Sequence, residues 1–136
     1  MKNFKLKVNI NRVHDKIVDH LEKNMMRVMV AMVAYVKSHF GPSNQGGSNP
    51  SSPGEAPNIG LGTLRNNITF TVSTDGNDVV GLYGVRKGPA SVYAKRLELG
   101  FVGTDKKGRN INQAPRPYLM PAYRNNKKRV VKILSS

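Results

Sequence analysis

The chain contains no cysteine and no tryptophan, and it has only three histidines among its 136 residues. Without cysteine it can hold no disulfide framework and no thiolate metal site, and this composition suits a reducing cytosol. The histidines, His14, His20 and His39, are spaced too widely for a two-ligand helical metal motif. We therefore expect the protein to bind no metal ion.

Sequence signatures of catalysis and nucleotide binding are missing as well. No Gly-x-x-x-x-Gly-Lys-Ser/Thr phosphate loop occurs, and Gly84-Val85-Arg86-Lys87-Gly88 lacks its spacing. The serines concentrate between residues 43 and 52, where no base and orienting carboxylate mark one of them as a nucleophile. The sequence predicts a protein that is not an enzyme and has no cofactor.

Long hydrophobic segments are also absent. Residues 1–7 carry positive charge but no apolar run follows them, so no secretory signal is visible. The most apolar stretch, residues 25–36, is shorter than the about 20 residues of a membrane span and is interrupted by Arg27. We expect a cytosolic protein that does not enter membranes. A membrane-active helix within residues 12–39 is the least favoured alternative.

Acidic residues are scarce: eight Asp and Glu stand against 22 Lys and Arg, which gives a net charge of +14. The charge is uneven, with 8 cationic and 3 acidic residues in 1–40, 1 and 3 in 41–85, and 13 and 2 in 86–136. Such a bias favours an anionic partner, whether nucleic acid, an anionic membrane or an acidic protein. A solvated basic surface explains it equally well.

A long N-terminal helix is the element that the sequence predicts most clearly. Apolar residues recur at steps of three or four over residues 12–39, Asn11 is suited to be the N-cap, and Gly41-Pro42 ends the run. Residues 25–36 are apolar almost all round, so both sides of the helix need a cover. Core packing and a contact with another subunit would each supply one. The candidate contact residues are Met26, Met29 and Val33.

The segment after this helix is rich in Gly, Pro, Ser and Asn and has almost nothing to bury. Burial of so few apolar groups cannot offset the ordering entropy of the segment. We expect a mobile loop at about residues 41–62 that a partner orders, and a passive flexible linker is the alternative. The candidate contact residues in the loop are Asn44 and Gln45.

A β-hairpin is predicted next. Apolar and polar residues alternate with period two over residues 64–73, a turn follows at Thr74-Asp75-Gly76-Asn77, and residues 79–85 form the second strand. Gly81 and Gly84 weaken that strand, so we expect a bulge there or the close approach of another backbone.

Two helices and a smaller hairpin complete a predicted α+β fold, which we expect to be a single domain over residues 1–136. The short middle helix covers residues 88–97 and is capped by Gly100. The smaller hairpin covers residues 101–113, and a C-terminal helix covers residues 119–133. One face of this last helix carries a cationic ridge, which an acidic partner or DNA would neutralise. The cationic ridge consists of Arg124, Lys128 and Lys132.

A basic DNA-binding accessory protein is the second functional hypothesis. Its 22 cations could neutralise several phosphates. Aromatic platforms are sparse, however, and neither a zinc-finger spacing nor an aromatic ribonucleoprotein motif occurs. A helix-turn-helix also needs two helices joined by a tight turn, whereas a long polar loop and a hairpin follow the first helix. The charge alone is a nonspecific signal.

Four motifs occur in one order along the chain: Ser52-Pro53-Gly54-Glu55-Ala56-Pro57, Gly62-Thr63-Leu64-Arg65-Asn66-Asn67-Ile68, Tyr93-Ala94-x-x-Leu97-Glu98-x-Gly100, and Arg116-Pro117-Tyr118-Leu119-x-Pro121-Ala122. With the order of the predicted elements, this pattern resembles the tail-completion or head-tail joining neck proteins of tailed bacteriophages over residues 12–134. Many members have threonine where Phe101 stands and phenylalanine where Tyr118 stands, and many read Asp-Thr-Gly where this chain has Leu61-Gly62-Thr63.

The resemblance implies a small α+β protein that adds to the neck or tail end of a virion as an oligomeric ring, assembled in the host cytoplasm. Its implied partners are further copies of itself, the head connector, the tail-tube or tail-terminator proteins, and DNA passing through the neck. Gly100 is expected to end a helix, while Pro115, Pro117 and Pro121 stiffen the entry to the last one. The motif residues expected in the core are Tyr93, Leu97, Tyr118 and Leu119.

Overall fold

The structure is a computed structural model that describes residues 3–9, 15–43, 51–59, 62–76 and 78–136. Its elements are β1 (Phe4–Asn9), α1 (Asp15–Ser38), β2 (Gly41–Ser43), β3 (Asn58–Ile59), α2 (Thr63–Asn66), β4 (Ile68–Asp75), β5 (Asp78–Val85), α3 (Ser91–Leu99), β6 (Phe101–Thr104), β7 (Asn110–Gln113) and α4 (Met120–Leu134). The predicted α+β class, with its long N-terminal helix, antiparallel sheet and C-terminal helix, is confirmed.

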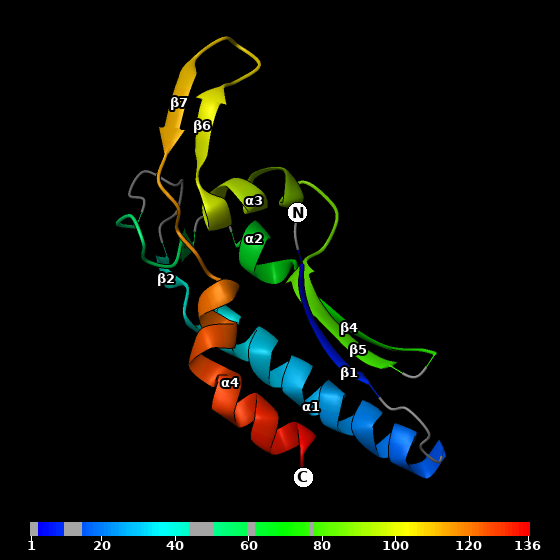
Figure 1. The fold of residues 1–136 in the computed structure, drawn as a ribbon. Coiled ribbons are helices and arrows are strands. Elements are labelled where there is room, and N and C mark those ends of the chain that lie inside the picture. The colour runs from blue at the N-terminus through cyan, green and yellow to red at the C-terminus, as the bar shows by residue number, and fades with distance from the viewer. Residues whose placement is uncertain (1–2, 10–14, 44–50, 60–61, 77) are drawn as a thin grey trace.

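The main sheet has three antiparallel strands in the order β1-β5-β4. Helix α1 packs on this sheet, and α4 runs antiparallel to α1 along its other side (Figure 1). The amide of Asn125 on α4 donates to Tyr35 Oη on α1 at 2.9 Å, and the amide of Asn24 donates to the carbonyl of Ser136 at 3.2 Å. Helix α1 is therefore enclosed between the sheet and α4.

This enclosure covers a large part of the apolar surface of α1. Five of its side chains are almost fully buried in the core, namely Met25, Val28, Met29, Met32 and Val36. Met29 was a candidate for a subunit contact, but it is buried in the core of its own chain, which is the other alternative that the sequence left open. Val33 is half-buried and packs against the same core, whereas Met26 is 46% exposed. Of the three candidate contacts on this helix, Met26 alone has an outward-facing side chain.

The contact between α1 and the sheet depends on Gly81 in β5. The ladder from β4 to β5 keeps a regular antiparallel register through Gly81, so the predicted bulge is absent. The backbones beside it are those of its two partner strands, β1 at Leu6 and β4 at Val72. Instead, a methyl group on Gly81 would lie 2.7 Å from the sulfur of Met25 and 2.9 Å from that of Met29. The glycine makes room for two methionine side chains of α1.

Gly81→Ala is expected to lower the free energy of unfolding by about 1–3 kcal/mol, because the methionines must move out of a packed core to accept the methyl group. Gly84→Ala is the matched control on the same strand, since its methyl group would meet the exposed side chain of Asn3, which can turn away. Chemical denaturation of both variants measures the effect. Equal losses in the two variants would contradict this packing.

Two parts of the fold differ from the sequence prediction. Strand β1 was not predicted, although Phe4, Leu6 and Val8 pack against the core while Lys5 and Lys7 are exposed. The predicted strand over residues 64–73 begins instead at Ile68, because the residues before it form the single turn α2. The Asn67 side chain donates to the Thr63 carbonyl at 2.7 Å and stabilises that turn.

The remaining elements follow the prediction closely. Helix α3 ends at Leu99, and Gly100 after it has a φ of +76°, a conformation that favours glycine. Strands β6 and β7 form the smaller hairpin, which projects away from the body of the molecule (Figure 1). Helix α4 begins at Met120 with Pro121 in its first turn.

Part of the expected loop at 41–62 is held in place. Strands β2 and β3 pair in parallel, and the Gly41 amide donates to the Pro57 carbonyl at 2.9 Å. Arg116 Nε donates to the Ser51 carbonyl at 2.8 Å, and the Gly54 amide donates to the Pro115 carbonyl at 2.9 Å. Asn44 and Gln45 lie outside the described residues, and the mobility of the loop stays a prediction.

Candidate functional site

The two motifs nearest the C-terminus meet at Glu98, whose side chain is 8% exposed. Its Oε2 accepts hydrogen bonds from the backbone amides of Tyr118 (2.8 Å) and Leu119 (3.0 Å), and its Oε1 accepts one from Met120 (2.9 Å). The first amides of a helix have no partner within the helix, and a negative charge there is favourable. The carboxylate at the end of α3 thus caps α4 from a distant part of the sequence.

Further hydrogen bonds fasten these two motifs together. The Tyr118 hydroxyl donates to the carbonyl of Ala94 at 3.0 Å, and the Arg116 amide donates to the carbonyl of Leu97 at 2.6 Å. The Tyr83 hydroxyl, on β5, donates to the carbonyl of Leu119 at 2.9 Å. These contacts make the motifs a structural junction between α3, α4 and the sheet.

The core positions predicted for the motif residues are correct with one exception. Tyr118 and Leu119 are buried, and Leu97 is half-buried against the core. Tyr93 is 40% exposed, so its predicted place in the core is wrong. Tyr93 lies on the outer side of α3, whereas its neighbour Ala94 is fully buried on the inner side.

Two buried tyrosines, Tyr83 and Tyr118, make the folding stability depend on pH in the alkaline range. Burial, reinforced by the carboxylate of Glu98, raises the pKa of Tyr118 and of Tyr83 above the ordinary value of about 10. The raised pKa belongs to the folded state, whereas the unfolded tyrosines keep a pKa of about 10. The stabilisation of the folded state by the two neutral tyrosines is therefore fully present below about pH 10. It is lost at higher pH, where the unfolded chain releases protons that the folded chain keeps.

We therefore expect the stability advantage of the natural protein over Tyr118→Phe to shrink by about 1.4 kcal/mol between about pH 9 and about pH 11. Denaturant titrations of both proteins at the two pH values measure the difference. Comparison with the variant cancels the titration of the many lysines. An advantage that stays constant or grows over this interval would contradict the assignment.

The outer side of the α1 and α4 pair is a candidate interaction surface. Between the helices runs an open groove of about 490 Å³. We call it the interhelical groove; its lining consists of Met26, Arg27, Val30, Ala31, Ala34, Arg129 and Ile133. Met26 is 46% and Val30 52% exposed, and Val131 on α4 is 59% exposed. Apolar side chains from both helices thus remain accessible.

Cations border these apolar side chains. A second depression is lined by Arg27, Arg129, Lys132, Ile133 and Ser136. All three members of the cationic ridge are exposed, and none forms an ion pair within the part of the chain that the structure describes. The structure brings Lys132 together with Arg27 and Arg129, whereas Arg124 lies at a different pocket. Arg27 and Arg129 were not predicted, because only tertiary contact between α1 and α4 makes them neighbours.

Within the described residues, no group of three or more His, Asp or Glu side chains is placed to hold a metal ion. None of the helices in the same part of the chain is long and apolar enough to cross a bilayer. Comparison of the chain with protein-family models, with curated proteins and with solved structures finds no significant match.

Proposed function

We propose that this chain is a non-enzymatic structural protein of the neck of a tailed bacteriophage, where it completes the tail and joins it to the head connector as an oligomeric ring. The observation that carries the proposal is the interhelical groove, in which exposed apolar side chains lie beside Arg27 and Arg129. The four motifs of the neck proteins support the same family, and two of them build the junction at Glu98.

A ring of identical subunits needs two different complementary surfaces on each subunit. The interhelical groove offers one of them. The hairpin of β6 and β7 is suited to be the other, because it projects from the body and its Val102 is 79% exposed (Figure 1). Buried apolar area would hold neighbouring subunits together, while the bordering cations would select an acidic surface on another neck protein.

The experiment that tests this proposal is complementation in vitro. Purified protein is added to a lysate of phage that lack the gene, and infectious particles are counted. We expect the number of particles to rise with the concentration of added protein. A lysate that stays without infectious particles at every concentration of folded protein would contradict a role as an added neck component.

The exposed cations also favour a second candidate, a basic DNA-binding accessory protein. For that function we expect tight binding of the isolated protein to duplex DNA, with an affinity that falls steeply as salt rises. Titration of a labelled duplex at two salt concentrations separates the candidates. Micromolar or tighter binding at physiological salt would favour the accessory protein, and negligible binding would favour the neck protein.

A further inference from the structure

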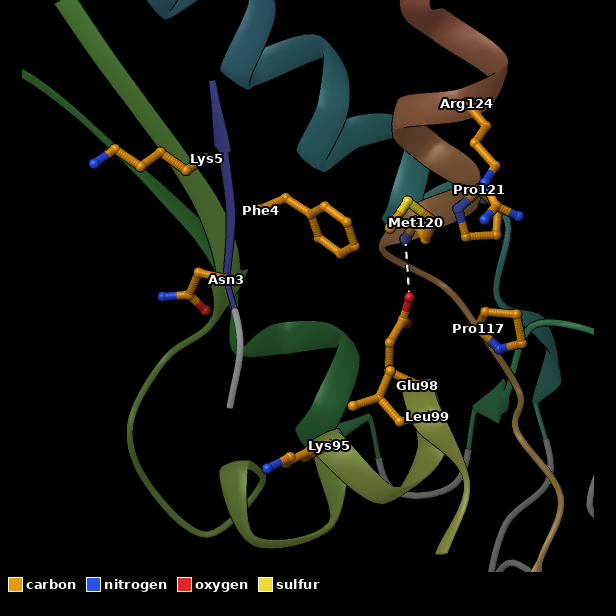
Figure 2. Close-up of a pocket in the computed structure, with 10 residues that line it drawn as sticks. All are labelled: Asn3, Phe4, Lys5, Lys95, Glu98, Leu99, Pro117, Met120, Pro121 and Arg124. Atoms are coloured by element: carbon orange, nitrogen blue, oxygen red, sulfur yellow. Dashed lines mark hydrogen bonds between the residues drawn. The ribbon is translucent and has the colours of Figure 1, made fainter. Parts of the chain in front are cut away.

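A pocket of about 510 Å³ opens where the start of β1, the end of α3 and the start of α4 meet (Figure 2). Figure 2 shows the ring of Phe4 pointing from β1 toward Glu98 and Met120. The rest of the apolar lining comes from Leu99, Pro117 and Pro121. The pocket is therefore built on the junction that fixes α3 to α4, which gives it a rigid wall.

The charged side chains that line this pocket are mainly positive. Lys5, Lys95 and Arg124 are exposed, and they form no ion pair within the described residues. Figure 2 shows the Lys5 side chain extending from the side of β1 opposite the Phe4 ring, so Lys95 and Arg124 are the cations that border the pocket. Glu98 is the acidic residue of the lining, but both of its carboxylate oxygens already accept hydrogen bonds from the start of α4. It is therefore committed to the cap, and Lys95 and Arg124 are available for an anionic group.

Leu99 gives the pocket an accessible apolar edge. It is the last residue of α3 and is 60% exposed. A single exposed leucine is common on a protein surface. This one, however, shares a concave site with Phe4, Met120 and two prolines. Such a site suits an apolar side chain whose neighbours carry negative charge.

We propose that this pocket docks an acidic segment of another protein, with one apolar side chain seated between Phe4, Leu99 and Met120 and with flanking carboxylates paired to Lys95 and Arg124. The inference goes beyond the proposed function, because it concerns a different pocket, which shares Arg124 with the cationic ridge, and does not require a phage neck. Nucleic acid fits less well, since its phosphates would pair with the cations but leave the apolar lining unfilled. Phe4 is the one aromatic ring of the lining on which a base could stack.

The test uses the full chain and a capped peptide in which one leucine is flanked on each side by two glutamates. We expect the peptide to shift the NMR signals of the Met120 methyl group and the Phe4 ring in a saturable manner. Replacing the leucine of the peptide by alanine should weaken binding at least about fivefold, because the apolar anchor is lost. Replacing its glutamates by lysines should abolish binding.

Two matched protein variants locate the binding site. Arg124→Glu should weaken binding of the glutamate peptide about five- to tenfold. Lys128→Glu changes the net charge equally and lies one turn away on α4, outside the pocket lining. It should change binding less than about twofold at physiological salt, where exposed charges are screened. Both side chains are exposed, so we expect both variants to fold.

Four results would overturn the inference. The first is equal weakening by Arg124→Glu and Lys128→Glu, which would show attraction by net charge alone. The second is equal affinity for the alanine and leucine peptides. The third is displacement of the peptide from the Met120 and Phe4 signals by duplex DNA at lower concentration, which would assign the pocket to nucleic acid. The fourth is a shift of these signals with protein concentration alone, which would assign it to a second copy of this chain.

Discussion

Glu98→Ala is expected to lower the free energy of unfolding by about 3–5 kcal/mol. The natural carboxylate accepts hydrogen bonds from three backbone amides at the start of α4. Alanine would leave these amides without their acceptor in a site where Tyr118 and Leu119 are buried. It would also remove the negative charge that stabilises the positive end of the helix. Urea denaturation followed by circular dichroism measures the loss.

Two controls make this result specific. Glu98→Gln keeps the shape and one acceptor oxygen but removes the charge, so we expect a smaller loss of about 1–2 kcal/mol. Glu55→Ala removes an exposed acid, and we expect a change within about 0.5 kcal/mol. If Glu98→Ala were as stable as Glu55→Ala, the junction between the motifs would not have the structural role described above.

Reversal of the cationic ridge, as the triple variant R124E/K128E/K132E, is expected to lower the number of infectious particles in complementation by about 100-fold or more. The ridge is exposed and unpaired among the described residues, so the substitutions should leave the fold intact. Like charges facing each other across an interface cost several kcal/mol. The acidic neck partner that we propose would therefore be repelled by the variant.

The matched control is K16E/R86E/K87E, which changes the net charge by the same amount at exposed positions away from α4. We expect this variant to complement nearly as well as the natural protein. Circular dichroism of both variants would establish that they are folded. Full complementation by both triple variants would exclude the ridge as a contact surface. The same loss of infectious particles with both variants would indicate that net charge alone matters.

The sequence predicts the regular elements because their signals are local. The apolar spacing in α1 and α4, the alternation in β4 and the glycine after α3 each lie within a few residues of the element they define. The overturned details come from short segments. β1 is one such segment, with three core-facing residues, Phe4, Leu6 and Val8. Because it lies at the charged N-terminus, we considered it only as a secretory signal and did not predict a strand.

The candidate surfaces were harder to predict, because they depend on contacts between distant segments. Arg27 and Arg129 become neighbours only when α4 packs on α1. The sequence singled out Glu98 as a motif residue, but nothing local shows that it caps α4, which begins only after the hairpin of β6 and β7. Met29 and Met26 belong to the same apolar run, and the position of the sheet decides which of them is buried.

We propose that this protein joins phage heads to tails, and electron microscopy of a gene deletion tests this proposal most directly. The gene is deleted from the genome that encodes it, and lysates of the resulting particles are imaged with and without the protein supplied in trans. We predict DNA-filled heads and separate complete tails in its absence, and joined particles when it is supplied. Joined, normal particles in the absence of the protein would contradict the claim.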